Sequence, residues 1–155
     1  MNIVIVYESQ FGTTEHLAQV IGSALEDRHS VRVVRGRTVA NLTSEGIDLL
    51  FVGAPTQVHG LRLLVRPFLG GLKSRGFAGM PVAAFDTRME GMTKGTGSAA
   101  DVIAQRLQAA GCYLAIEPEG FVVSGLTGPL AQGEEERARV WALEAVERLP
   151  VAAPT

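Results

Sequence analysis

The sequence opens with MNIVIVYESQFGTTEHLAQVIGSAL, residues 1–25, in which a strand, a turn and a helix follow one another. Residues 3–7 form an apolar, β-branched run without polar alternation, which is typical of a strand buried on both faces. The turn at 9–12 ends in a glycine, and apolar residues then recur at helical spacing over 13–27. This unit predicts the beginning of an alternating α/β chain.

Four more apolar runs predict strands at residues 31–34, 48–53, 81–85 and 121–124. Strands that alternate with helices favour a parallel sheet covered on both faces. The two usual solutions are a dinucleotide-binding fold and a sheet of order 2-1-3-4-5. Five strands in a chain of this length favour the second solution. We therefore predict an α/β fold of three layers, built on a doubly wound, five-stranded parallel sheet.

Three further segments carry helical patterns. The first covers residues 61–72, although a proline and two glycines weaken its second half. The second covers 98–110, where Ser98 and Asp101 form a capping box. The third begins at 134–136, where glutamates complement the helix dipole. Its apolar stripe, which we expect to face the core, consists of Val140, Trp141, Leu143, Val146 and Leu149.

Length and composition narrow the possible classes of protein. A chain of 155 residues indicates one domain, residues 1–150, followed by a frayed tail at 151–155. A net charge of −2 offers no basic field for nucleic acid, and no apolar run approaches the length of a membrane span. The N-terminus lacks a secretory signal pattern, so we expect a cytoplasmic protein. The single cysteine, Cys112, excludes an internal disulfide, and we expect it to pack in the interior.

The first loop, residues 8–14, carries the clearest chemistry of the sequence. It has one glycine and no lysine, so it is neither a dinucleotide fingerprint nor a Walker A loop. Ser9, Thr13 and Thr14 can donate to a phosphate, and Gly12 permits close approach of the backbone. Amides at the start of the helix add partial positive charge, so the loop can hold a phosphate monoester without a cation. The alternative is an ordinary turn and helix cap.

Three loops together resemble those of the flavodoxins. YESQFGTTEHLAQVIGSAL resembles the opening of that family, whose phosphate loop has the pattern S/T-x-S/T-G-x-T, with Phe11 in place of the middle hydroxyl residue. DLLFVGAPTQVHG, residues 48–60, resembles the loop that lines one side of the FMN ring. AAFDTRMEG, residues 83–91, occupies the position of the loop on its other side. The resemblance spans the chain and is closest to the short-chain type.

The resemblance implies a flavodoxin-like sheet of order 2-1-3-4-5, a non-covalently bound FMN and electron transfer through it. The partner would be a redox protein, either reductase or acceptor, or a small-molecule acceptor. By the resemblance, the phosphate would be held by Ser9, Gln10, Phe11, Gly12, Thr13 and Thr14. The ring would be lined by Pro55, Thr56, Gln57, Val58, His59 and Gly60 on one side. On its other side would lie Asp86, Thr87, Arg88, Met89 and Gly91.

The sequence departs from the flavodoxin pattern at the ring. No tyrosine or tryptophan is present in the two ring loops. In flavodoxins a glycine of the second loop often lets a peptide flip, and Val58 occupies the nearest equivalent position here, with Gly60 two residues later. Basic residues also gather near the proposed site. They could attract an acidic partner, an anionic substrate or the phosphates of a nicotinamide cofactor, or they could simply be solvated. These residues are Arg62, Arg66, Arg88 and Lys94.

Two alternative functions stay open at the level of sequence. The first is a flavin-dependent reductase or dehydrogenase acting on a quinone or porphyrinogen, because a less covered ring leaves room for a substrate. The second is a flavin-free fold used as a binding module. No nucleophile with a base is recognisable, and no histidine has a partner at metal-ligand spacing. We therefore predict neither a catalytic side chain nor a metal site, and the sequence does not fix the oligomeric state.

Overall fold

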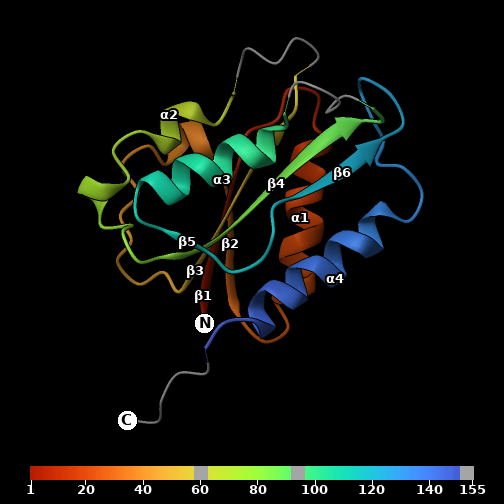
Figure 1. Cartoon of the computed structure of the whole chain (residues 1–155). Coiled ribbons are helices and arrows are strands. Elements are labelled where there is room, and N and C mark those ends of the chain that lie inside the picture. Colours follow the sequence, from red (N-terminus) through yellow and green to blue (C-terminus); the bar gives the residue numbers. More distant parts are fainter. Residues whose placement is uncertain (58–62, 92–96, 151–155) are drawn as a thin grey trace.

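The computed structural model describes residues 1–57, 63–91 and 97–150. The described strands form one parallel sheet in the order β2-β1-β3-β4-β5, with β6 paired to β4 (Figure 1). This confirms the predicted doubly wound fold and its order 2-1-3-4-5. The strands are β1 (Asn2–Tyr7), β2 (Ser30–Arg35), β3 (Leu49–Pro55), β4 (Pro81–Met89), β5 (Tyr113–Leu114) and β6 (Glu119–Val123).

The fifth position of the sheet is shared by two short strands. β5 pairs with the first two residues of β4, whereas β6 pairs with residues 85–89 at its carboxyl end. The pairing with β6 extends β4 beyond its predicted end at Phe85, so the predicted loop from Asp86 begins only after Met89. The third predicted group of ring-lining residues therefore lies largely on a strand.

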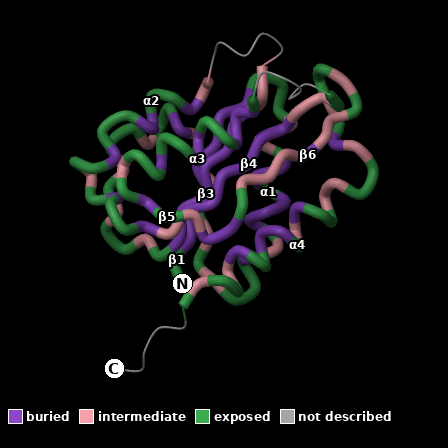
Figure 2. The backbone as a smooth tube through the Cα atoms, viewed as in Figure 1, coloured by how far each residue is buried: buried purple, intermediate pink, exposed green. Residues whose placement is uncertain are grey.

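Helices cover both faces of the sheet. α1 (Thr13–Leu25) and α4 (Glu134–Glu147) lie on one face, and α2 (Arg66–Leu69) and α3 (Ala99–Ala109) on the other (Figure 1). Two short 3-10 turns, η1 (Gly36–Thr38) and η2 (Lys73–Arg75), complete the described helices. Figure 2 shows buried residues along the central strands β3 and β4, and exposed residues in the helices around them. No described helix has both the length and the apolar character to cross a membrane.

The core under α1 and α4 is built around Trp141, as predicted for this residue. Its indole meets Phe51, Phe85 and Phe121 edge-to-face, with ring centroids 5.7, 6.3 and 5.8 Å away. Such contacts stabilise beyond the area that they bury. At Gly53 of β3 a Cβ would overlap the ring of Phe85, so only glycine fits beneath this aromatic cluster.

Two predicted helices differ in the structure. α4 has helical periodicity, but Val140 and Leu143 are 55% and 45% exposed. The predicted Trp141 is buried, and the predicted Val146 and Leu149 are partly buried and pack against the core. The other buried residues of the helix are Ala138, Ala142 and Ala145, because small residues let it lie close to the sheet and to α1. The predicted helix 61–72 is reduced to α2, and residues 58–62 lie outside the described part of the chain. Extended backbone at Gly70 ends α2.

The N-terminus of α3 is capped as the sequence predicts. The Ser98 hydroxyl accepts a hydrogen bond from the Asp101 N–H at 3.1 Å. Two further amides of this first turn are also satisfied by side chains from other elements. The Ala99 N–H donates to Thr56 Oγ1 and the Ala100 N–H to Asp86 Oδ2, at 3.0 and 2.9 Å. α3 is thereby fixed to the carboxyl ends of β3 and β4.

Candidate functional site

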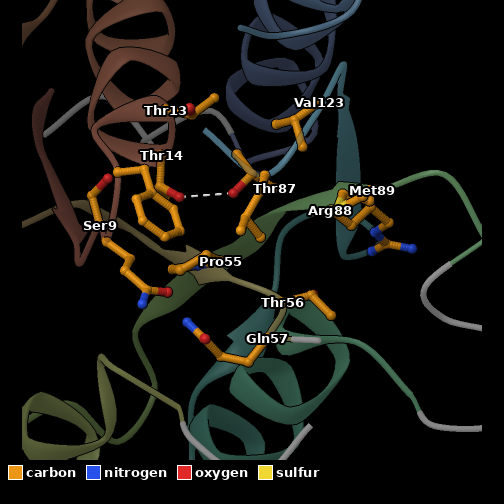
Figure 3. A pocket seen from close by; sticks show the side chains of 13 residues that line it. Ser9, Thr13, Thr14, Pro55, Thr56, Gln57, Thr87, Arg88, Met89 and Val123 are labelled. Carbon is orange, nitrogen blue, oxygen red and sulfur yellow. Dashed lines mark hydrogen bonds between the residues drawn. The ribbon is translucent and has the colours of Figure 1, made fainter. Parts of the chain in front are cut away.

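A pocket opens at the carboxyl edge of the sheet, where ligands of open α/β sheets bind (Figure 3). The pocket is open on one side, and its cavity volume is about 50 Å³. The walls come from the first loop, the beginning of α1, and the ends of β3, β4 and β6. The described lining residues are Ser9, Gln10, Phe11, Thr13, Thr14, Pro55, Thr56, Gln57, Thr87, Arg88, Met89, Val123 and Leu126. None of these is acidic, and Arg88 is the cation among them.

The structure brings most of the predicted site residues together. Three of them do not line the pocket: Gly12 shapes the first loop, Asp86 lies fully buried, and Gly91 follows β4. The predicted residues Val58, His59 and Gly60 lie outside the described part of the chain. The predicted roles of all these residues toward a ligand stay predictions.

The backbone of the first loop turns at Gly12, which lies at the N-cap of α1 with φ +91°. This left-handed conformation favours glycine. The Gly12 N–H donates to the Ser9 hydroxyl at 3.0 Å, and Thr13 Oγ1 donates to the Thr127 carbonyl at 3.4 Å. The first N–H groups of α1 have no acceptor within the helix. Partial positive charge therefore collects at this end of the pocket.

Thr14 and Thr87 form a buried hydroxyl pair between α1 and β4. Their Oγ1 atoms lie 2.8 Å apart, and the residues are 1% and 4% exposed (Figure 3). Only one of the two hydroxyl hydrogens is used between them, because a single hydrogen bond joins the pair. The other hydrogen is left for a further acceptor at the wall of the pocket.

Arg88 is bound by its own strand. Its Nε and Nη2 donate to the two carboxylate oxygens of Asp86, both at 2.8 Å. The guanidinium lies over Gly120 of β6, where a Cβ would overlap it. Asp86 has no exposed surface and also accepts the Ala100 N–H. The charge of Arg88, one of the basic residues that the sequence predicts near the site, is therefore matched by a fixed carboxylate.

The β3 side of the pocket is held by Thr56. Its N–H donates to the Thr87 carbonyl at 2.8 Å, which continues the β3–β4 ladder past the end of β3. Its hydroxyl accepts the N–H of Ala99 from α3. Pro55, Thr56 and Gln57 thus form a wall whose backbone is fixed to β4 and α3 together.

Two lining residues are absent from the sequence-based prediction. Val123 ends β6, and Leu126, which is 58% exposed, follows it in the next connection. The available signal was topological, because the carboxyl end of every parallel strand reaches the same edge of the sheet. Together with Phe11, which is 47% exposed, Leu126 adds apolar surface at the rim. The described residues contain no group of histidine, cysteine and acidic side chains that could hold a metal.

Comparisons with protein-family models and with curated proteins gave no match. Among solved structures, the fold is similar to that of oxidised flavodoxin 1 from Bacillus cereus, with a TM-score of 0.80 and 21% identity over 97% of this chain and 100% of the other. The chain has the flavodoxin fold. A flavodoxin from the domain Archaea matches with a TM-score of 0.77 and 20% identity over 96% of this chain and 98% of the other.

A third flavodoxin, that of Megasphaera elsdenii in its two-electron-reduced form, gives a TM-score of 0.66 at 22% identity. It covers 94% of this chain and 98% of its own. These likenesses establish the flavodoxin-like fold that the first, second and third loops predict. They extend over nearly the whole length of each chain.

Proposed function

We propose that this flavodoxin-like chain binds FMN non-covalently in the pocket and carries electrons through it. The main support is the division of the pocket into two ends. Hydroxyls and helix amides gather at the first loop, whereas the other walls are mostly neutral or apolar. None of the described lining residues is acidic, so no carboxylate in the described wall of the pocket would repel an anionic group.

The phosphate of FMN fits the end formed by the first loop and α1. The Ser9 hydroxyl and the first amides of α1, beginning with the Thr13 N–H, would hold it, as neutral donors do at other helix N-termini. The buried Thr14–Thr87 pair would supply the hydrogen that it does not use internally. The donor set therefore suits a phosphate monoester.

The ring would lie between the remaining walls. Pro55, Thr56 and Gln57 would form one side, and Met89 the other, with apolar contact from Val123 and Leu126. Bound FMN would supply the one- and two-electron redox chemistry. The chain would orient the cofactor and keep part of it accessible at the open side, where Phe11 and Leu126 offer apolar contact to a redox partner or a small acceptor.

Titration of the purified protein with FMN tests this function. We expect quenching of FMN fluorescence with a dissociation constant of about 1 μM or tighter. Unchanged emission at flavin concentrations of about 10 μM or more would rule out FMN binding in this range and favour a flavin-free binding module.

If FMN binds, the electron donor separates a carrier from an enzyme. A carrier should be reduced through a reductase protein and reoxidised by a second protein. Turnover of a quinone with a nicotinamide cofactor would instead favour the flavin-dependent reductase.

A further inference from the structure

A buried carboxylate lies directly behind the first loop, outside the set of lining residues. Glu8 follows β1 and is 2% exposed. Its carboxylate accepts the Arg35 Nε–H at 3.2 Å, the Arg37 main-chain N–H at 2.6 Å and Arg37 Nη2 at 3.3 Å. A carboxylate so deeply buried needs such partners, because an unpaired one would be costly. The arrangement joins the end of β1 to the end of β2 and to η1.

Arg35 also contacts the first loop itself. Its Nη2 donates to the Ser9 carbonyl at 2.9 Å, while its Nε contacts Glu8. The guanidinium also lies 5.9 Å from the centroid of the Tyr7 ring. Three separate contacts thus fix the planar guanidinium of Arg35. Its forked N–H donors can reach Glu8 and the Ser9 carbonyl at the same time.

The bond to the Ser9 carbonyl sets the direction of the next amide. The described part of the chain has its one cis bond at Gly128–Pro129, so the Ser9–Gln10 peptide is trans. In a trans peptide the C=O and the following N–H point in opposite directions. The Gln10 N–H therefore faces away from Arg35. Gln10 lines the pocket, and no described residue accepts its N–H.

We infer that Arg35, held by Glu8, is a positioning residue that orients the Ser9–Gln10 peptide for an anionic ligand. It holds the carbonyl dipole away from the anion and presents the Gln10 N–H to it. The inference rests on the proposed function, because FMN is the ligand whose phosphate would lie at this loop. It assigns the pair a role in selecting flavins that carry a phosphate over riboflavin, which carries none.

Arg35→Lys tests the fork rather than the charge. Lysine keeps the cation but lacks the planar fork that reaches Glu8 and the Ser9 carbonyl together. We expect the dissociation constant for FMN to rise about tenfold or more, while that for riboflavin changes by less than about twofold. The matched control is Arg32→Lys, on the same strand, where the exposed arginine has no ion pair among the described residues.

Glu8→Gln provides a second variant that keeps the shape of the side chain and removes its charge. Like Arg35→Lys, it should lower the preference for FMN over riboflavin. Wild-type affinity for FMN in both variants would overturn the inference. Equal weakening of FMN and riboflavin would also overturn it, since that result indicates a general loss of structure.

The amide of Gln10 supplies a readout that needs no flavin. In spectra of ¹⁵N-labelled protein, inorganic phosphate should shift the Gln10 amide downfield in the wild type and much less in Arg35→Lys. No shift in the wild type, or an equal shift in the variant, would contradict the inference. Failure of the wild type to bind FMN would by contrast refute the proposed function, while the phosphate titration still tests the peptide.

Discussion

The carboxyl ends of β1 and β4 carry similar groups that serve different purposes. Each end has a buried carboxylate, Glu8 or Asp86, that pairs with an arginine and accepts a main-chain N–H from another element. At β1 the arginine comes from β2, and it reaches past the carboxylate to the Ser9 carbonyl. At β4 the arginine lies two residues away on the same strand, and the carboxylate anchors α3.

This difference shows that charge near a pocket does not by itself define a role. Arg88 lines the pocket, but its charge is matched by Asp86 within one strand. Arg35 does not line the pocket, yet its contacts set the direction of a loop peptide that does. The β4 pair should therefore matter mainly for stability, and the β1 pair for both stability and ligand binding.

The largest expected effect is on the stability of the β4 end. Asp86→Asn should lower the free energy of unfolding by about 3 kcal/mol, because it removes the charge of a fully buried carboxylate that pairs with Arg88 and weakens the anchor of α3. Urea unfolding followed by Trp141 fluorescence measures the change. Asp101→Asn, an exposed acid in the first turn of α3, is the control. A loss of unfolding free energy similar to that of the control would show that the Asp86–Arg88 pair does not stabilise the fold more than an exposed acid does.

Glu8→Gln should cost less, about 1.5 kcal/mol in the same unfolding experiment. The glutamine oxygen can still accept the Arg37 N–H, and both arginines at this end are more exposed than Arg88, with side chains 32% and 66% exposed against 22%. A larger loss for Glu8→Gln than for Asp86→Asn would reverse the ranking of the two ends.

The energy of the Thr14–Thr87 hydroxyl pair, which joins α1 to the β4 end, can be measured by a double-mutant cycle. Thr14→Val and Thr87→Val should each cost about 1 kcal/mol, since each removes the buried hydrogen bond between them. The double variant should lose less than the sum, with a coupling of about 1 kcal/mol. Strict additivity would mean that the two hydroxyls do not interact in solution.

The smallest effect concerns a third carboxylate–arginine pair, at the start of α4. A hydrogen bond from Arg137 holds the pKa of Glu134 below its usual value, and the Val122 N–H adds to this effect, while burial opposes it. Because the folded pKa is lowered, the pair stabilises fully above the unfolded pKa of about 4.3. This contribution is lost as the pH falls through the folded pKa.

The difference in unfolding free energy between the wild type and Glu134→Gln should therefore become smaller as the pH is lowered. Unfolding free energies measured across the acidic range test this expectation. A difference that grows at low pH would have the wrong sign for a carboxyl whose pKa is lowered by folding.

Most of the fold could be predicted because buried parallel strands leave apolar runs that need no tertiary information. The helix phase was harder. In α4 the alanines, not Val140 and Leu143, face the sheet, because small side chains allow the helix to pack closely. The extent of β4 also depended on a neighbour, since β6 supplies the pairing that carries the strand to Met89.

The site was predicted to a lesser degree. The first loop and the wall at residues 55–57 could be identified from their residue types and their place after a strand. The pairing of Arg88 with Asp86 was harder to foresee, because it depends on the space that Gly120 leaves on a neighbouring strand. The role of Glu8 also escaped prediction, since its partners Arg35 and Arg37 lie in β2 and η1, distant in sequence.

The location of bound FMN is the most direct test of the account. Addition of FMN to ¹⁵N-labelled protein should shift the amides of the first loop, of Thr56 and Gln57, and of the segment from Val123 to Leu126. Amides at the opposite edge, such as those of Asn2 and Ile47, should not move. Shifts confined to that opposite edge, or no shifts at saturating FMN, would contradict the claim that this pocket holds the cofactor.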